Sequence, residues 1–130
     1  MIIVAAAIIH RDQYILLTKR PANVHLPNLW EFPGGKVEAG ESLEAALRRE
    51  LREELDIEAN VIDEFFTTTH HYPAKSVEIH FFNCTIASGE PRSLEVADFR
   101  WVKSSDLHAY EFPEADRELI ERLVRPHSSM

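Results

Sequence analysis

The alternation of apolar and polar residues divides the chain into short strands and two amphipathic segments. The apolar run at residues 2–9 predicts a buried strand, and residues 14–18 predict its partner beyond a turn at residues 11–13. Residues 29–32 predict another short strand, which leads to a glycine pair at 34–35 that we expect to lie in a loop. The beginning of the chain therefore predicts a hairpin followed by one further strand.

The rest of the chain adds more strands and a closing helix. We predict strands over residues 61–71, 77–87 and 99–102, one helical turn at 104–107, and an amphipathic helix at 114–124. A polar turn at residues 73–76 separates the first two of these strands. Strands on both sides of a central helix, followed by a closing helix, predict an α/β sandwich.

Residues 42–55 predict the central helix. Ser42 is a favourable N-cap, Glu44 lies in the first turn, and strong helix formers continue to Leu55. At about 100° per residue, the leucines at positions 43, 47, 51 and 55 spread over about 120° and form a stripe that faces the core. Three glutamates, at positions 50, 53 and 54, fall directly beside this stripe.

Two interpretations account for these glutamates. A solvated acidic face is the common one, although like charges at this spacing destabilise a helix by about 0.2–0.5 kcal/mol per pair. Here Arg48 and Arg52 point away from the glutamates, at about 140° and 180° from Leu43. Carboxylate oxygens are the ligands that Mg²⁺ and Mn²⁺ prefer, so the pattern favours a divalent-metal site.

The same stretch resembles the Nudix box. In that pattern a glycine, five residues, a glutamate and seven residues precede arginine-glutamate, an aliphatic residue, any residue and two glutamates, with a glycine and an aliphatic residue at the end. The matching positions are Gly35, Glu41, Arg49, Glu50, Leu51, Glu53, Glu54 and Ile57. The departure is Asp56 in place of the last glycine. Because aspartate tolerates a left-handed turn, we interpret Asp56 as a variation of the helix end that leaves the chemistry unchanged.

The resemblance extends beyond the box to MutT-type members of the family, which hydrolyse nucleoside triphosphates. Residues 29–36 resemble the entry to the box in that group. Glu95 stands six residues before Trp101, the spacing at which the group places a further metal-binding glutamate. Residues 112–116 resemble the segment that holds the base, except that Asp116 stands where the oxidised-guanine hydrolase of the group has asparagine.

This resemblance implies a Nudix-like α/β/α sandwich with a mixed central sheet over residues 1–125, with residues 126–130 as a tail. It implies hydrolysis of a nucleoside triphosphate to a monophosphate and pyrophosphate, and a role in sanitation of the nucleotide pool and DNA repair. It also implies a magnesium site, with manganese as an alternative. The implied ligands are the Gly34 carbonyl, Glu50, Glu53, Glu54 and Glu95.

The resemblance assigns roles to the remaining box residues. Glu50 is either a metal ligand or the base that activates water, and Glu53 belongs to the same catalytic set. Arg49 orients Glu50, and Glu41 supports the site from the loop before the helix. The implied substrate-binding residues are Arg20, His25, Glu31, Phe32, Lys36, Lys75 and Asp116, with Lys36 placed to pair with phosphate. For Lys75, an ordinary solvated turn lysine is the alternative.

Asp116 bears on the choice of base. At the start of the closing helix a carboxylate is stabilised in its ionised form, and an ionised carboxylate only accepts hydrogen bonds. It therefore suits an exocyclic amine, so we expect cytidine triphosphates such as CTP or dCTP to be at least as good as guanine ones such as 8-oxo-dGTP. The alternative is that Asp116 only caps the helix and that backbone groups near Phe32 read the base.

Composition and charge narrow the possible functions. The 130 residues form one domain with 45% hydrophobic and 28% charged residues. A single cysteine, Cys84 in an apolar run, excludes a disulfide framework and a thiolate metal cluster. The net charge of −8 disfavours stable binding to nucleic acid or to an anionic membrane. We expect a cytoplasmic protein, because no targeting segment is evident. We expect it to be a monomer or a homodimer.

Two other functions remain open. One is a nucleotide-binding module that keeps the fold without catalysis, against which the complete set of box glutamates argues. The other is a Nudix hydrolase that acts on a different nucleoside diphosphate derivative, such as a nucleotide sugar, a dinucleotide or a capped RNA end. The short chain leaves little room for a second large substrate group.

Overall fold

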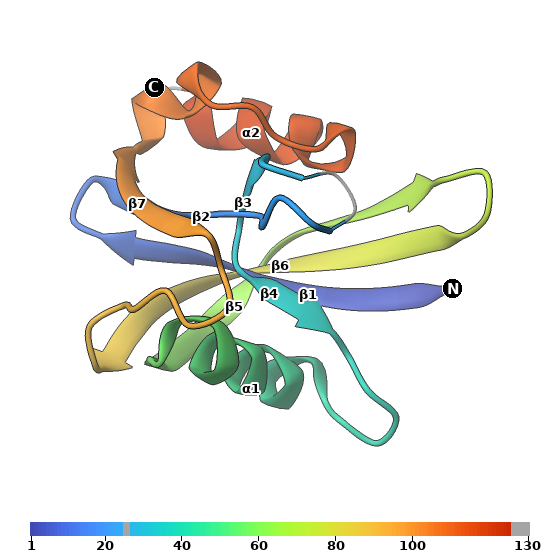
Figure 1. The fold of residues 1–130 in the computed structure, drawn as a ribbon, viewed down its shortest axis with the longest axis horizontal. Coiled ribbons are helices and arrows are strands. Elements are labelled where there is room, and N and C mark those ends of the chain that lie inside the picture. The colour runs from blue at the N-terminus through green and yellow to red at the C-terminus, as the bar shows by residue number, and fades with distance from the viewer. Residues whose placement is uncertain (25–26, 126–130) are drawn as a thin grey trace.

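The computed structural model describes residues 1–24 and 27–125 and places a mixed sheet between two helices (Figure 1). Helix α1 lies on one face of the sheet and helix α2 on the other, which confirms the α/β/α sandwich. The strands are β1 (Ile2–Arg11), β2 (Tyr14–Lys19), β3 (Trp30–Glu31), β4 (Gly34–Lys36), β5 (Glu58–His71), β6 (Ser76–Ser88) and β7 (Asp98–Lys103). The helical elements are α1 (Leu43–Leu55), α2 (Arg117–Val124) and two short 3₁₀ helices, η1 (Ser104–Ala109) and η2 (Glu114–Asp116).

Strand β1 is the centre of the sheet. The main strand order is β3-β2-β1-β6-β5, with β4 also paired to β1 and β7 also paired to β2. Strand β1 runs parallel to β6 and antiparallel to β2 and β4, so the sheet is mixed, as expected. Alternate residues of β1 then serve the two faces: Ala5, Ala7 and Ile9 pack under α1, and Ala6 and Ile8 pack under α2.

The central helix begins and ends where the sequence predicts. The Ser42 hydroxyl accepts a hydrogen bond from the Ala45 N–H at 3.1 Å, which caps the N-terminus. Leu47, Leu51 and Leu55 are fully buried against the sheet. Asp56 adopts the left-handed conformation, with φ 59° and ψ 41°, and its N–H bonds to the Arg52 carbonyl. The aspartate therefore performs the backbone role that the Nudix box gives to glycine.

Two elements differ from the prediction. The glycine pair is not a loop: Gly34 and Gly35 form β4, paired with Ala6 and Ala5 of β1. A side chain on Gly34 would overlap the Ala5 carbonyl, and its φ of +153° also favours glycine, so the pair permits a close strand contact. At the other end of the chain, residues 114–116 form η2 rather than the first turn of the closing helix, because the Asp116 N–H bonds to the Pro113 carbonyl, three residues back.

Cys84 has the packing role expected for a lone cysteine in an apolar run. Its side chain is fully buried in the cluster beneath α1, and burial raises the pKa of its thiol to about 12. Within residues 1–24 and 27–125, no helix is both long and apolar enough to cross a membrane.

Candidate active site

The glutamates of α1 meet the glycine strand β4. A Cβ on Gly35 would overlap the Glu50 carboxylate, so any other residue here would displace that side chain. The backbone of Gly34 donates a hydrogen bond to Glu54, and the carboxyls of Glu50 and Glu54 share a hydrogen bond. We call Glu50, Glu53, Glu54 and Gly34 the carboxylate edge.

Arg49 holds the carboxylate edge to the loop before the helix. Its Nε and Nη2 donate to the two oxygens of Glu41 at 2.8 and 2.9 Å, which is a bidentate pair. Nη2 also donates to the Lys36 carbonyl at 3.0 Å. Nη1 donates to Glu50 at 3.2 Å and to Glu53 at 3.4 Å. One guanidinium therefore contacts both Glu50 and Glu53.

One acid of this region has a lowered pKa, and two have raised pKa values. Hydrogen bonds from Arg49 lower the pKa of Glu41 to about 2, and that bond also raises the pKa of Arg49. Burial, followed by the charges of Glu31 and Glu50, raises the pKa of Glu54 to about 9. Burial also raises the pKa of Glu50, although Arg49 opposes the shift. With both ionised, Glu50 and Glu54 carry more negative charge than Arg49 offsets.

The chemistry of these donors fits a hard divalent cation, which would relieve the repulsion between Glu50 and Glu54. The five expected ligands are not all brought together. Glu53 turns to Arg49 with its side chain 46% exposed, and Glu95 is exposed. In the part of the chain that the structure describes, no three carboxylate, histidine or cysteine side chains converge as a ready-made ligand set. A cation would therefore have to draw Glu53 or Glu95 inward.

The loop that carries Glu95 closes the C-terminal end of α1. The N–H groups of Arg92 and Leu94 donate to the carbonyls of Leu55 and Glu54, at 2.9 and 3.1 Å. The Glu95 N–H approaches the same Glu54 carbonyl at 3.4 Å. These bonds satisfy carbonyls that the helix end leaves free, and they place Glu95 beside the carboxylate edge.

A concavity lies on the other face of the sheet. This cleft, of about 180 Å³, runs from β1 and β6 to the segment before α2, and we call it the inner cleft. Five of the expected substrate residues line it: Arg20, Glu31, Phe32, Lys75 and Asp116. Lys36 is instead exposed on β4, and His25 lies outside the described residues. Residues from four separate parts of the sequence therefore line one cleft.

The inner cleft contains two carboxyl groups and one arginine. Arg20 donates to Glu31 at 2.9 Å, yet burial still raises the pKa of Glu31. Asp116 is only 6% exposed, and burial, followed by the charge of Glu31, raises its pKa to about 7. We expected Asp116 to be ionised by the helix end, and that was wrong. It makes no capping hydrogen bond, and desolvation dominates, so near neutral pH it is present in both forms.

The sequence did not identify Tyr72 as a site residue. It lines the inner cleft at the tip of the β5–β6 hairpin, where its N–H bonds to the Lys75 carbonyl at 2.8 Å. Burial, followed by the charge of Asp116, raises the pKa of its phenol. An aromatic residue directly before a polar turn was the available signal. Phe32, which also lines the cleft, stacks on Phe112 with ring centroids 5.7 Å apart.

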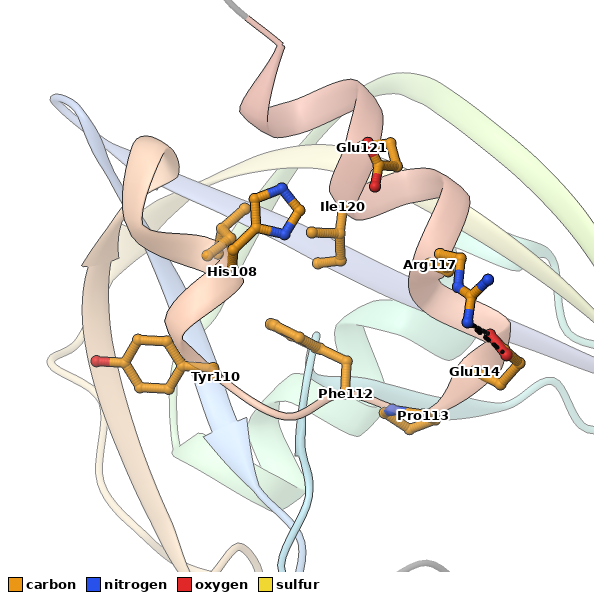
Figure 2. A pocket seen from close by; sticks show the side chains of 9 residues that line it. His108, Tyr110, Phe112, Pro113, Glu114, Arg117, Ile120 and Glu121 are labelled. Carbon is orange, nitrogen blue, oxygen red and sulfur yellow. Dashed lines mark hydrogen bonds and ion pairs between the residues drawn. The ribbon is translucent and has the colours of Figure 1, made fainter.

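A larger concavity lies next to the inner cleft but contains none of the expected residues. This outer pocket, of about 520 Å³, is shown in Figure 2 between α2 and the segment at 107–114. Glu114 and Arg117 form an ion pair of 2.9 Å at one end of it. Pro113 lines both concavities, so the segment around it is the wall between them.

The inner cleft and the carboxylate edge adjoin at Glu31. This residue lines the cleft, and its charge raises the pKa of both Glu54 and Asp116. A ligand with a planar polar ring in the cleft would direct an attached anionic group toward the edge where a cation fits.

Comparisons with known proteins identify the relatives of this chain. The profile of the NUDIX domain family matches residues 4–122. The chain is 40% identical to the CTP pyrophosphohydrolase of Escherichia coli K12, over 95% of this chain and 92% of that one. It is 39% identical to the 8-oxo-dGTP diphosphatase of Haemophilus influenzae, over 95% and 92% of the two chains. Among solved structures, the E. coli ORF135 protein superposes with a TM-score of 0.82 at 38% identity, covering 98% of this chain and 95% of that one.

Proposed function

The chain belongs to the NUDIX domain family and is a Nudix hydrolase, and from this premise we propose that it is a magnesium-dependent pyrophosphohydrolase of nucleoside triphosphates. The reaction converts a nucleoside or deoxynucleoside triphosphate and water to the monophosphate and pyrophosphate. The observation that carries the proposal is the junction at Glu31, where a cleft suited to a base meets an edge suited to a cation and phosphates.

The carboxylate edge holds the metal in this proposal. The Gly34 carbonyl, Glu50, Glu53, Glu54 and Glu95 are the proposed ligands of Mg²⁺, with Mn²⁺ as an alternative. Burial and neighbouring negative charges raise the pKa of Glu50 and of Glu54. A cation would offset the negative charge, so that both carboxyls lose their proton more readily beside it, and this supports the assignment. Bound there, the ion neutralises phosphate charge and makes a coordinated water more acidic.

The protein's own groups position the reaction. Arg49 holds Glu50 and Glu53 in place, and Glu41 holds Arg49 through two hydrogen bonds. Glu50, or Glu53 in its place, accepts the proton of the attacking water. Lys36, exposed on the neighbouring strand, is free to pair with a phosphate. Phosphoryl transfer needs positioning and charge stabilisation more than covalent help, and these residues supply both.

The inner cleft selects the base. The relatives named for CTP and for 8-oxo-dGTP match the chain almost equally, so identity does not choose between their substrates. Ionised, Asp116 accepts a hydrogen bond from an exocyclic amine such as that of cytosine; protonated, it donates to a carbonyl. With its pKa near 7, we propose that cytidine triphosphates are preferred above neutral pH and that oxidised guanine nucleotides gain below it.

The proposed role is removal of modified or surplus triphosphates from the cytoplasmic nucleotide pool, which protects DNA. The small volume of the inner cleft supports a single base over the second large group of a nucleotide sugar or dinucleotide.

A panel of triphosphates tests the proposal. The purified chain is assayed with CTP, dCTP, 5-methyl-dCTP, dGTP and 8-oxo-dGTP in Mg²⁺, and pyrophosphate and phosphate are measured separately. We expect pyrophosphate and monophosphate in equal amounts, and no turnover when Mg²⁺ is chelated. Release of single phosphates, or turnover of a nucleotide sugar above every triphosphate, would overturn the assignment.

A further inference from the structure

A third concavity lies under the C-terminal end of α2. This cleft, of about 620 Å³, shares no residue with the inner cleft, and we call it the far cleft. Both lie on the same face of β1 and β6, at opposite ends. Val4 and Ala6 line the inner cleft, Ile8 lies in the apolar core between the two, and His10 lines the far cleft. Helix α2 ends at Val124, and Leu123 in its last turn lines the far cleft.

The floor of the far cleft is polar where the rest of the face is apolar. On β6, Ile79 and Phe81 continue the apolar pattern, but the next residue on that face is Asn83. Its amide Nδ2 donates to Asp63 at 2.9 Å, and its Oδ1 accepts from Nε2 of His10 at 2.8 Å. This chain of bonds crosses three strands and fixes the amide and the imidazole in one orientation.

The walls combine apolar surface with positive charge. Phe65 is 40% exposed, and the half-buried Leu123 and the buried Ile15 are the other apolar residues of the lining. Lys103 has no ion-pair partner among the residues the structure describes. The second cation, Arg122, pairs with Glu118 at 3.2 Å and lies 4.7 Å above the Phe66 ring.

Against these two cations the lining carries a single carboxylate, Asp12, in a chain whose net charge is −8. Ser104 and Ser105 add hydroxyl groups next to Lys103. An exposed aromatic ring stabilises a planar ligand by stacking, whereas the cations and hydroxyls are groups that bind phosphate. The fixed amide and imidazole offer hydrogen bonds to the edge of a planar ring.

We propose that the far cleft is a second ligand site, for a nucleoside monophosphate. Its ring lies against Phe65, Ile15 and Leu123, and its phosphate lies between Lys103 and Arg122. The size of the cleft falls in the range of small-molecule sites. The site is independent of the catalytic proposal, because none of its residues belongs to the carboxylate edge or the inner cleft.

Titration by NMR tests the site. The ¹⁵N-labelled full chain is titrated, without divalent metal, with CMP, with cytidine and with inorganic phosphate. We expect CMP to shift the amides of Phe65, Asn83 and Ser104 with a dissociation constant of about 1 mM or tighter. Cytidine and phosphate alone should each bind at least about tenfold more weakly, because each makes half of the contacts. Shifts confined to the inner cleft, at Phe32, Tyr72 and Asp116, would overturn the proposal.

Matched variants separate the site from general charge effects. Lys103→Gln combined with Arg122→Gln should weaken CMP binding at least about tenfold. Arg117→Gln is the control, because Arg117 also lies exposed on α2 in an ion pair with a glutamate, and it should leave binding unchanged. Phe65→Ala should weaken CMP but not inorganic phosphate. Wild-type affinity in the double variant, or equal affinity for phosphate and CMP, would contradict a nucleotide site.

Discussion

Each face of the sheet has two carboxyl groups with raised pKa values near one arginine, and the two arginines are used differently. Under α1, Arg49 is held by Glu41 and the Lys36 carbonyl and gives Glu50 only a longer bond of 3.2 Å. Under α2, Arg20 donates directly to the cleft residue Glu31 at 2.9 Å.

This difference separates the two tasks of the site. Under α1 the arginine is held in place by Glu41 and offsets little of the charge of Glu50 and Glu54. These acids therefore keep excess negative charge and attract a cation. Under α2 the arginine offsets one carboxyl, and the second, Asp116, is left to titrate near neutral pH. The first pair is suited to metal and phosphates, and the second is suited to reading hydrogen bonds on a base.

The largest expected effect is the loss of turnover when charge is removed from the carboxylate edge. Glu50→Gln and Glu53→Gln should each lower turnover by about 10²-fold or more, because each loses a metal ligand or the base that activates water. Steady-state rates with Mg²⁺ measure this, and circular dichroism should show an unchanged fold. Glu44→Gln, on the same helix and paired only with Arg48 at 3.8 Å, is the matched control. Near-normal rates in both site variants would sink the assignment.

A smaller loss of turnover should follow when Arg49 is replaced by a residue of the same charge. Lysine cannot reproduce the bidentate bond to Glu41, so Arg49→Lys should lower kcat by about tenfold while KM changes little. Arg48→Lys on the same helix serves as the control. If the two variants behave alike, Arg49 does not position the catalytic glutamates.

The α2 face should respond through the choice of base. Because Asp116 ionises near pH 7, the ratio of dCTP to 8-oxo-dGTP turnover should rise about threefold or more between about pH 6 and pH 8. Asp116→Asn should abolish this dependence, since asparagine donates and accepts at every pH. Asp106→Asn, at an exposed position, is the control. An unchanged ratio in Asp116→Asn would mean that Asp116 does not read the base.

Metal should stabilise the α1 face, most strongly at high pH. The folded pKa of Glu54, about 9, exceeds its ordinary value of 4.5, so the folded state binds more protons and the metal-free protein loses stability as the pH rises between these values. At a hundredfold excess over its dissociation constant, Mg²⁺ adds about 2.7 kcal/mol. Melting temperatures at two pH values, with Glu54→Gln as a variant that lacks the pH slope, measure this. Absence of any shift at millimolar Mg²⁺ would contradict the metal site.

The two faces also differ in what the sequence predicts. The carboxylate edge depends on residues 34–54, a local stretch whose helical period fixes which side chains are neighbours. The helix limits and the left-handed turn at Asp56 were therefore predictable. The pairing of Gly34 with Ala6 was not, because no local pattern specifies which distant strand will pair with the glycines.

The inner cleft combines five segments that are far apart in the sequence, and its electrostatics depend on burial. The resemblance to MutT-type enzymes placed Arg20, Glu31 and Asp116 in one site, but the charge state expected for Asp116 was wrong. The desolvation of Asp116 depends on how distant segments pack around it, the Tyr72 hairpin among them. No single stretch of the sequence encodes that packing. Side-chain identity was predictable here, whereas protonation was not.

The loop at 92–95 caps the C-terminal end of α1 and also carries Glu95, so fraying of the helix end and movement of Glu95 are linked. When this loop detaches, the last carbonyls of the helix lose their partners and Glu95 moves away from the C-terminal end of α1 in the same step. Amide hydrogen exchange at Arg92 and Leu94 should therefore report the opening of the catalytic end of the helix. On heating, this local opening would silence the enzyme while the rest of the sheet is still intact.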